Sequence, residues 1–277
     1  MVRWLERCRP YSAGGGRVEA TKDGVRLTLP GASSSRYSDA QLDDYAGLAR
    51  ARYPHRPPLR LSLRARFSHE AKSDRGDTQN TGQAQVSACL PGSLLGTAGF
   101  GLWNNPFGAQ SKFPGLPQVL WYFHASPPSN MALALGVPGL GWKAACLDAG
   151  RVPALAWSPL ALPVMFLCRW PKLCRSIWPR VQRSLAIRES LLTFRAGSLT
   201  DWHTYELEWR TDGARWQVDG ETALDTERPP RGPLGFVAWI DNQTAVVTPQ
   251  GKFNFGLLDT PREQWLELGE VDVTRET

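Results

Sequence analysis

The alternation of apolar and polar residues over positions 59–67 is the feature that most restricts the fold of this 277-residue chain. The apolar members are Leu59, Leu61, Leu63, Ala65 and Phe67, and Arg or Ser stands between them. Successive side chains of a β-strand point to opposite faces, so a period of two predicts a strand with one buried and one exposed face. Such a strand is typical of an antiparallel sheet that packs on one side only.

Other segments carry strand signals, and turn signals separate them. Strands are predicted over 25–29, 97–103, 118–124, 204–209, 214–218, 234–240 and 265–273, with 131–135 as a further candidate. Asp212-Gly213 and Asp219-Gly220 favour tight turns after two of them. Residues 31–58 are polar and predict a loop with one helical turn, and 69–85 predict another loop. The pattern as a whole predicts an all-β chain.

We expect one β-sandwich domain over residues 1–277, with 1–16 as a loose leader and 153–195 as a helical insert. Arg3, Glu6 and Arg7 stand where a secretory signal needs an apolar run, so we expect no such signal and a cytoplasmic location. The 5 cysteines contain no C-x-x-C pair, which argues against a disulfide framework or a structural zinc site.

The insert at 153–195 differs from the rest of the chain. Residues 152–168 are apolar but broken by three prolines, so they do not predict a membrane-spanning helix. Positions 173, 177, 181 and 185 are apolar and predict one helix face, with a kink at Pro179. Two interpretations stay open for this insert, a lid or packing helix on the sandwich and an element in a membrane interface.

Almost all of the net charge of +6 comes from this same insert. Residues 169–195 contain seven Lys or Arg and one acid, Glu189, while the remainder of the chain is neutral. A nucleic-acid-binding protein normally shows a basic surface that follows the phosphate backbone. We therefore do not expect a nucleic-acid partner.

Two neighbouring segments resemble the signature of glycoside hydrolase family 16. They contain Trp202-His203-Thr204-Tyr205 and then Val218-Asp219-Gly220. Residues 59–67 with 99–103 resemble the strands before that family's catalytic strand, and 266–273 resembles its closing strand. The resemblance implies a concanavalin A-like antiparallel β-sandwich, or jelly roll, with a concave cleft. Hydrolases, transglycosylases and lectins share this fold, so function must be argued from the site.

The family's catalytic motif is absent where the resemblance places it. That motif, Glu-x-Asp-x-(x)-Glu, supplies the two carboxyls of a retaining glycosidase. The corresponding strand, 118–124, contains no carboxylate. A similar string at Glu270, Asp272 and Glu276 lies in the closing strand and is interpreted as coincidental. We therefore do not expect a standard retaining glucanase.

Three residues are candidates for replacement catalytic groups. Within 118–124, alternate residues share a face, and we expect Tyr122 and His124 to look into the cleft, where His124 would act as acid or base. Asp241 ends a strand among aromatic residues and is either an acid with a raised pKa or the start of an Asx turn. Glu70 in a polar loop is the third candidate.

Glu70 also belongs to the one candidate metal site. Together with His69, Asp74 and Asp77 it offers oxygen ligands that suit calcium, although a solvated loop is the simpler interpretation. We therefore expect no cofactor, and structural calcium in this loop stays open as the alternative.

Aromatic and amide residues near predicted strand ends are candidates for ligand binding. Trp rings stack on sugars and also stabilise cations, and amides suit sugar hydroxyls. The candidates are Trp103, Asn104, Asn105, Trp121, Tyr122, Trp239, Asn242 and Gln243.

Three functions remain open at this point. The first is an enzyme acting on a glycoside or glycolipid-like ligand with non-standard catalytic groups. The second is a lectin-like carbohydrate binder without catalysis. The third is an acid-catalysed isomerase or cyclase of an apolar, terpenoid-like substrate. The missing carboxylates argue against the first, and the apolar insert favours the third.

Overall fold

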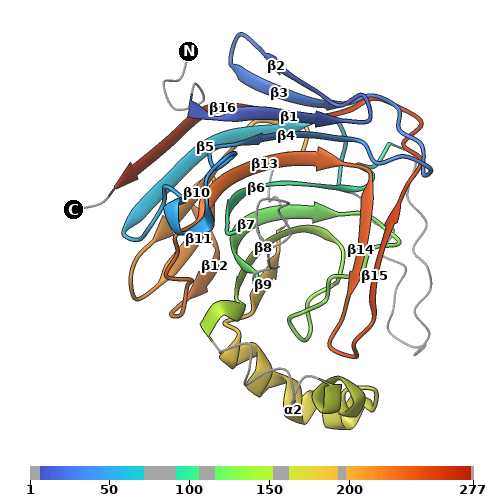
Figure 1. Cartoon of the computed structure of the whole chain (residues 1–277), viewed down its shortest axis with the longest axis vertical. Helices are drawn as coiled ribbons and strands as arrows, with labels where there is room; N and C mark the ends of the chain where they lie inside the picture. The colour runs from blue at the N-terminus through green and yellow to red at the C-terminus, as the bar shows by residue number, and fades with distance from the viewer. Residues whose placement is uncertain (1–6, 72–91, 106–115, 152–161, 193–197, 276–277) are drawn as a thin grey trace.

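Two seven-stranded antiparallel sheets form most of the structure, a computed structural model (Figure 1). It describes residues 7–71, 92–105, 116–151, 162–192 and 198–275. The first sheet has the order β1-β4-β13-β6-β7-β8-β9, and the second has the order β12-β11-β10-β5-β16-β3-β2. A separate two-stranded hairpin, β14-β15, projects from the end of the first sheet. The expected antiparallel β-sandwich with a helical insert is confirmed.

The first sheet contains β1 (Arg9–Ala13), β4 (Asp39–Asp43), β13 (Gly235–Asp241), β6 (Thr97–Trp103), β7 (Gln118–Ala125), β8 (Gly141–Asp148) and β9 (Arg188–Leu191). The second contains β12 (Glu221–Thr226), β11 (Ala214–Val218), β10 (His203–Trp209), β5 (Leu59–Phe67), β16 (Gln264–Arg275), β3 (Gly24–Leu29) and β2 (Arg17–Ala20). The remaining elements are β14 (Gln243–Val247), β15 (Phe253–Leu257), α2 (Pro171–Ser184) and the short 3-10 turns Arg50–Arg52 and Ala149–Arg151.

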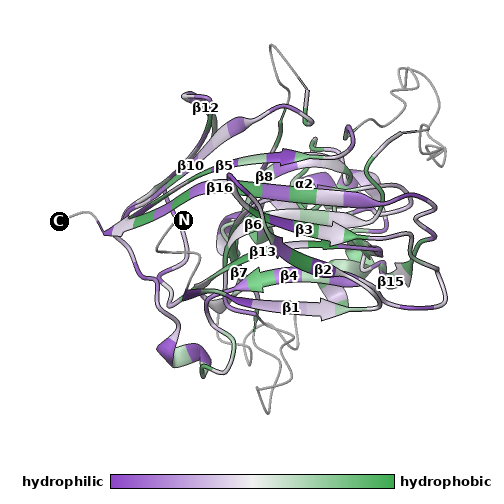
Figure 2. Cartoon of the chain, turned by 90° about the horizontal axis from the view of Figure 1, so that it is seen from above, coloured by the Kyte–Doolittle hydropathy of each residue, from purple (hydrophilic) through white to green (hydrophobic). Residues whose placement is uncertain are grey.

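The alternating strand β5 lies at the centre of the second sheet, between β10 and β16. All five of its apolar residues are buried and its Arg and Ser side chains are not, as the sequence predicts. Seen from above and coloured by hydropathy, the strands show hydrophobic and hydrophilic segments alternating along their length (Figure 2). The buried faces of the two sheets meet in one apolar cluster that runs from Cys8 to Val271.

Aromatic rings fill the middle of this core. Phe100 on β6 lies 4.9 Å from Tyr205 on β10 and 5.5 Å from Tyr122 on β7, measured between ring centroids. Trp142 on β8 lies 5.7 Å from Phe100 in an edge-to-face arrangement. Large rings bury much apolar area and prefer such tilted contacts. These four rings join the two sheets, and they also fix which face of β6, β7 and β8 points outward.

Several strands lie where the sequence did not predict them. Residues 9–13, expected as leader, form β1 because they pair in register with β4, and β4 itself falls inside the expected loop 31–58. β8 lies between β7 and β9 and was not predicted. Residues 131–135, a candidate strand, are not one. Short polar strands such as β1 and β4 form through pairing with neighbours, which local sequence does not reveal.

The insert packs on the sandwich through helix α2. Its buried residues Cys174, Trp178 and Val181 meet Ala134 and Ile187, and Trp178 Nε1 donates a hydrogen bond to Leu133 O at 2.7 Å. The buried face of α2 differs by one residue at its start from the predicted face of 173, 177, 181 and 185. Leu173 is exposed, and its neighbour Cys174 is buried instead.

Helix α2 includes Pro179 and continues beyond it to Ser184. The parts of the predicted insert at 153–161 and 193–195 lie outside the described residues. Within the described ranges, no helix is both long enough and apolar enough to cross a bilayer.

We predict that Tyr122→Phe destabilises the fold by about 1–3 kcal/mol. The Tyr122 hydroxyl lies 2.6 Å from Glu206 O and 2.8 Å from Gln217 O, so its hydrogen links the first sheet to the second. Its loss leaves buried carbonyl groups without a donor. Urea unfolding measures the change. Tyr11→Phe, on an exposed ring, is the control and should change the free energy of unfolding by less than about 0.5 kcal/mol.

Candidate active site

A cleft of about 420 Å³ lies on the outer face of the first sheet, opposite the core. Strands β6, β7, β8 and β13 form its floor, and the hairpin β14-β15 contributes to its wall. Most of the lining is apolar or aromatic. The lining residues are Tyr37, Asp39, Gln41, Thr97, Trp103, Pro117, Val119, Trp121, Phe123, Met131, Leu133, Ala145, Cys146, Leu147, Ile187, Glu189, Val237, Trp239, Asp241, Gln243, Ala245, Val247, Phe253 and Phe255.

Contiguous aromatic rings cover the floor. The Trp121 ring lies 5.4 Å from Trp239, 6.1 Å from Trp103 and 5.6 Å from Phe123. The rings are able to meet across β6 because glycine stands at its outward positions. A Cβ on Gly99 would lie 2.9 Å from the Trp239 ring. This explains the alternation of glycine with core residues in 97–103.

Two of the indole N–H groups in the cleft are already engaged. Trp239 Nε1 donates to Thr97 Oγ1 at 3.0 Å, and Trp103 Nε1 donates to the Tyr45 hydroxyl at 2.7 Å. These Trp residues therefore offer a bound molecule their ring faces and not a hydrogen-bond donor.

Two carboxyl groups lie side by side at one end of the cleft. Asp241, the last residue of β13, pairs directly with Asp39, the first residue of β4. Asp241 Oδ1 accepts hydrogen bonds from Thr97 Oγ1 at 2.8 Å and from Gln243 N at 3.0 Å. Asp39 is hydrogen-bonded to the Tyr37 side chain. Both aspartates are buried, and Asp39 Oδ1 has no hydrogen-bond partner within the described part of the chain.

Burial raises the pKa of Asp241 to about 6 even though three hydrogen bonds oppose the shift. Burial, and then the charge of Asp241, raises the pKa of Asp39 well above its ordinary value. Two neighbouring buried carboxyls resist ionising together, so their titrations are linked. The pair therefore keeps a proton to a higher pH than an ordinary aspartate does.

A second polar pair lies near the other end of the floor. Lys143 Nζ donates to Glu189 Oε1 at 3.1 Å, Met131 O at 3.0 Å and Pro138 O at 3.1 Å, which uses all three of its hydrogens. It lies 4.9 Å from the centre of the Phe123 ring. Lys143 is fully buried, and desolvation lowers its pKa. The saturated hydrogen bonding indicates that this pair holds the 131–138 loop in place.

Five of the residues predicted for the site line this cleft. They are Trp103, Trp121, Trp239, Asp241 and Gln243. The structure thus brings together the predicted acid and the predicted aromatic residues, which come from three different strands and the start of a fourth.

The expectation that His124 and Tyr122 look into the cleft is wrong. Both point from β7 into the core, and Trp121 and Phe123 point outward instead. His124 Nε2 lies 3.0 Å from Leu94 O, and complete burial lowers the pKa of His124 to about 4. A neutral, enclosed imidazole is a structural group. Tyr122 likewise serves the contact between the sheets.

Glu70, Asn104 and Asn105 are also absent from the cleft lining. Glu70 accepts a hydrogen bond from the Ser198 hydroxyl. Asn104 Nδ2 donates to Leu116 O at 2.9 Å, and Asn105 O accepts from the Arg50 guanidinium at 3.0 Å. These contacts give Asn104 and Asn105 structural roles at the end of β6.

Asn242 lies beneath the cleft and positions its acidic end. Its side chain is fully buried. Oδ1 accepts a hydrogen bond from Ser38 N at 2.9 Å, and the two hydrogens of Nδ2 are shared among the carbonyl oxygens of Ser33, Arg36 and Leu258. These bonds hold the loop that carries Tyr37 and leads into Asp39.

Sequence reasoning missed Tyr37, Asp39 and Glu189. The alternation Asp39-Ala40-Gln41-Leu42-Asp43 was a signal for a short strand with one polar face. Only the pairing of β4 with β13 shows that this polar face meets Asp241.

Among the described residues, no cluster of three or more His, Cys, Asp or Glu could hold a metal ion. Asp74 and Asp77, half of the predicted calcium loop, lie outside the described residues. The calcium prediction is therefore neither supported nor contradicted.

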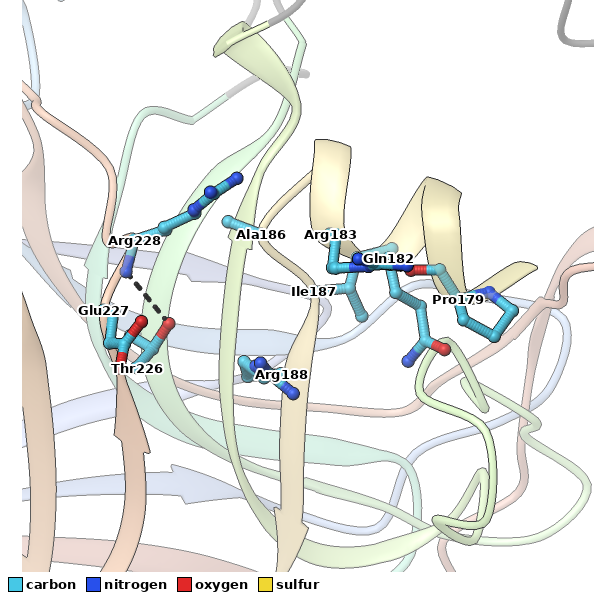
Figure 3. A pocket seen from close by; sticks show the side chains of 9 residues that line it. All are labelled: Pro179, Gln182, Arg183, Ala186, Ile187, Arg188, Thr226, Glu227 and Arg228. Atoms are coloured by element: carbon cyan, nitrogen blue, oxygen red, sulfur yellow. Dashed lines mark hydrogen bonds between the residues drawn. The ribbon is translucent and has the colours of Figure 1, made fainter. Parts of the chain in front are cut away.

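A second cavity of about 330 Å³ lies between the end of α2, the start of β9 and the end of β12. Arg183, Arg188 and Arg228 line it together with Glu227 (Figure 3). The Arg183 guanidinium donates to Pro179 O at 3.3 Å. The cavity extends the positive charge of the insert and is separate from the aromatic cleft.

No protein-family model matches this chain, and neither does any curated protein. Among solved structures, it is similar to a Crh5 transglycosylase in complex with NAG, at 8% identity and a TM-score of 0.46 over 99% of this chain and 80% of that one. A Bacteroides ovatus mixed-linkage glucan GH16 protein has 10% identity and a TM-score of 0.45 over 96% and 94%. The Emp46p carbohydrate recognition domain has 13% and 0.41 over 95% and 88%. At such values the function must be argued from the cleft itself.

We predict a pH-dependent stability that originates in the acidic pair. An unfolded Asp has a pKa of about 3.9. In the folded chain, burial raises the pKa of Asp241 to about 6 and also raises the pKa of Asp39. Between these values the folded chain holds protons that the unfolded chain has released. The free energy of unfolding therefore falls as the pH rises through this window.

Urea unfolding of the wild type and of Asp39→Asn with Asp241→Asn, measured from about pH 4 to pH 6.5, checks this prediction. Other carboxylates titrate alike in both proteins, so the readout is the difference between them. The double variant should lose less stability as the pH rises. A difference that does not vary with pH would contradict the prediction.

Proposed function

We propose that the cleft binds an amphiphilic small molecule with a largely hydrocarbon body, and that the Asp39–Asp241 pair donates a proton to a carbon–carbon double bond of that molecule. The observation that carries the proposal is a buried carboxyl pair at the end of an apolar and aromatic cleft. Among the described residues, one oxygen of this pair has no hydrogen-bond partner. It corresponds to the acid-catalysed isomerase or cyclase considered from the sequence.

The lining favours an apolar body over a bare sugar. A sugar ring is able to stack a C–H face on an indole, but hydroxyls surround its edge, and each buried hydroxyl needs a hydrogen-bond partner. Here the indole N–H groups of Trp103 and Trp239 are engaged, and the side chains beside them are Val119, Val237 and Ala145. The volume of about 420 Å³ suits a small ligand.

The proposed reaction needs no co-reactant, because the proton that the pair donates is later returned to it. The protonated pair gives its proton to an alkene carbon of the substrate. A new C–H bond forms from the electrons of the double bond, and the other alkene carbon becomes a cation. The carboxyl pair is left with one more negative charge. Loss of a proton from a neighbouring carbon of the cation then re-forms a double bond and restores the pair. The net reaction is an isomerisation or a ring closure.

The aromatic floor suits the cation that such a step creates. Ring faces attract positive charge, by about 0.5–2 kcal/mol for each well-placed ring. Trp121, Trp239 and Phe123 present their faces in one continuous surface beside the acid. The charged form of the acidic pair adds an attractive charge after it has given up its proton.

Binding separates this proposal from carbohydrate recognition. We predict that farnesol, a prenyl alcohol, quenches tryptophan fluorescence more strongly than a laminari-oligosaccharide at equal concentration. Trp121→Ala should weaken farnesol binding by about tenfold or more, since an aromatic anchor commonly contributes over 1 kcal/mol. Trp265→Ala, in the second sheet, is the matched control and should bind normally. Tighter binding of the oligosaccharide would favour the glycoside or lectin functions instead.

Proton transfer is tested separately. Incubation of the protein with prenyl alkenes in D₂O, followed by mass spectrometry, should show deuterium entering the recovered alkene. Asp241→Asn should lower the rate about 100-fold or more while leaving binding nearly unchanged, because general-acid catalysis contributes about 10²–10⁴. Asp225→Asn, on exposed β12, is the control. Normal exchange in Asp241→Asn would remove the acid assignment.

A further inference from the structure

The insert carries an exposed apolar surface that its packing on the sandwich does not use. Leu162, Phe166, Trp170 and Leu173 have exposed fractions of 71%, 54%, 49% and 42%. Phe166, Trp170 and Leu173 line a shallow hollow together with Leu167, Pro171, Lys172 and Arg175. Phe166 and Trp170 pack edge to face, with ring centroids 5.1 Å apart. We call Leu162, Phe166, Leu167, Trp170 and Leu173 the insert surface.

Cations rim the insert surface, and the sequence supplies no acid near it. Arg169, Lys172 and Arg175 are exposed, and the Arg169 guanidinium lies 5.6 Å from the centre of the Phe166 ring. No Asp or Glu occurs between positions 149 and 188. An aromatic and aliphatic patch with a purely cationic rim has the chemistry of a surface that enters the headgroup region of an anionic bilayer.

The insert contacts the hairpin that borders the cleft. Gln250, in the turn of the β14-β15 hairpin, donates a hydrogen bond from Nε2 to Cys174 Sγ of α2 at 3.9 Å. Figure 1 shows the hairpin tip and the insert at the same end of the molecule. Phe253 and Phe255 of β15 line the cleft, yet 66% and 50% of their surface is exposed. Exposed aromatic rings therefore occur both on the insert and on the hairpin at the edge of the cleft.

We propose that the insert surface docks this protein on the surface of an anionic phospholipid bilayer, with the mouth of the cleft beside the lipid. The charge complementarity of Arg169, Lys172 and Arg175 with anionic headgroups selects this occupant over a neutral apolar partner. The aromatic and aliphatic side chains enter the acyl boundary without crossing the bilayer. Docking stands on this surface alone, whatever the cleft binds.

Co-sedimentation with vesicles tests the docking. The full chain should sediment with mixed phosphatidylcholine–phosphatidylserine vesicles and much less with phosphatidylcholine alone, and added salt should release part of it. Lys172→Glu with Arg175→Glu should weaken binding by at least about tenfold, since each cation near an anionic surface is worth about fivefold. Phe166→Ser with Trp170→Ser should abolish it.

Matched controls lie on other surfaces. Arg52→Glu with Arg56→Glu makes the same charge change, and Tyr11→Ser removes an equally exposed aromatic ring. Both should sediment like the wild type, and circular dichroism melting confirms that every variant folds. Farnesol binding measured without vesicles should be unaffected by the insert-surface variants, so a failure of docking and a failure of the cleft proposal are told apart.

Two outcomes would overturn the proposal. One is the absence of sedimentation with anionic vesicles, or equal sedimentation of the wild type and the insert-surface variants. The other is a concentration-dependent dimer, seen by light scattering, that the Phe166→Ser with Trp170→Ser change disrupts while sedimentation persists. That result would assign the insert surface to a second copy of this chain.

Discussion

The packing of Phe100, Tyr122 and Trp142 against the second sheet determines the direction of every side chain in the cleft. Successive residues of a strand point to opposite faces, so placing Tyr122 and His124 in the core forces Trp121 and Phe123 outward. The same constraint on β6 turns Gly99 and Gly101 to the outside, which leaves room for the indole rings to meet. The aromatic rings on the cleft floor therefore point outward because other aromatic residues of the same strands point into the core.

The proximity of Asp39 and Asp241, and with it their raised pKa values, depends on where strands β4 and β13 begin and end. Asp241 closes β13 and Asp39 opens β4, so the register sets their side chains directly opposite each other. Hydrogen bonds from Thr97 and Gln243 stabilise one carboxylate, and the buried surroundings oppose a second charge. Such an environment raises the pKa of both carboxyls above that of an ordinary aspartate, as is common for acids at functional sites.

The insert connects the hairpin beside the cleft with the exposed insert surface. One face of α2 packs on the sandwich through Cys174, Trp178 and Val181, and the preceding turns leave aromatic and cationic side chains exposed. The hydrogen bond between Gln250 and Cys174 connects the insert to the hairpin that borders the cleft. A lid-like packing element and a membrane-facing surface are therefore compatible, because they use different faces of the same segment.

The sequence alone determined the class of the fold, the positions of its long half-buried strands such as β5, and the aromatic and acidic character of the site at Trp121, Trp239 and Asp241. These follow from periodicity and from residue type, which are local properties. Tertiary structure decided which face of β7 is buried, that residues 9–13 and 39–43 become strands, and that Asp39 joins Asp241. Strand pairing between residues some 200 positions apart sets these features, and no local pattern encodes the register of such a pairing.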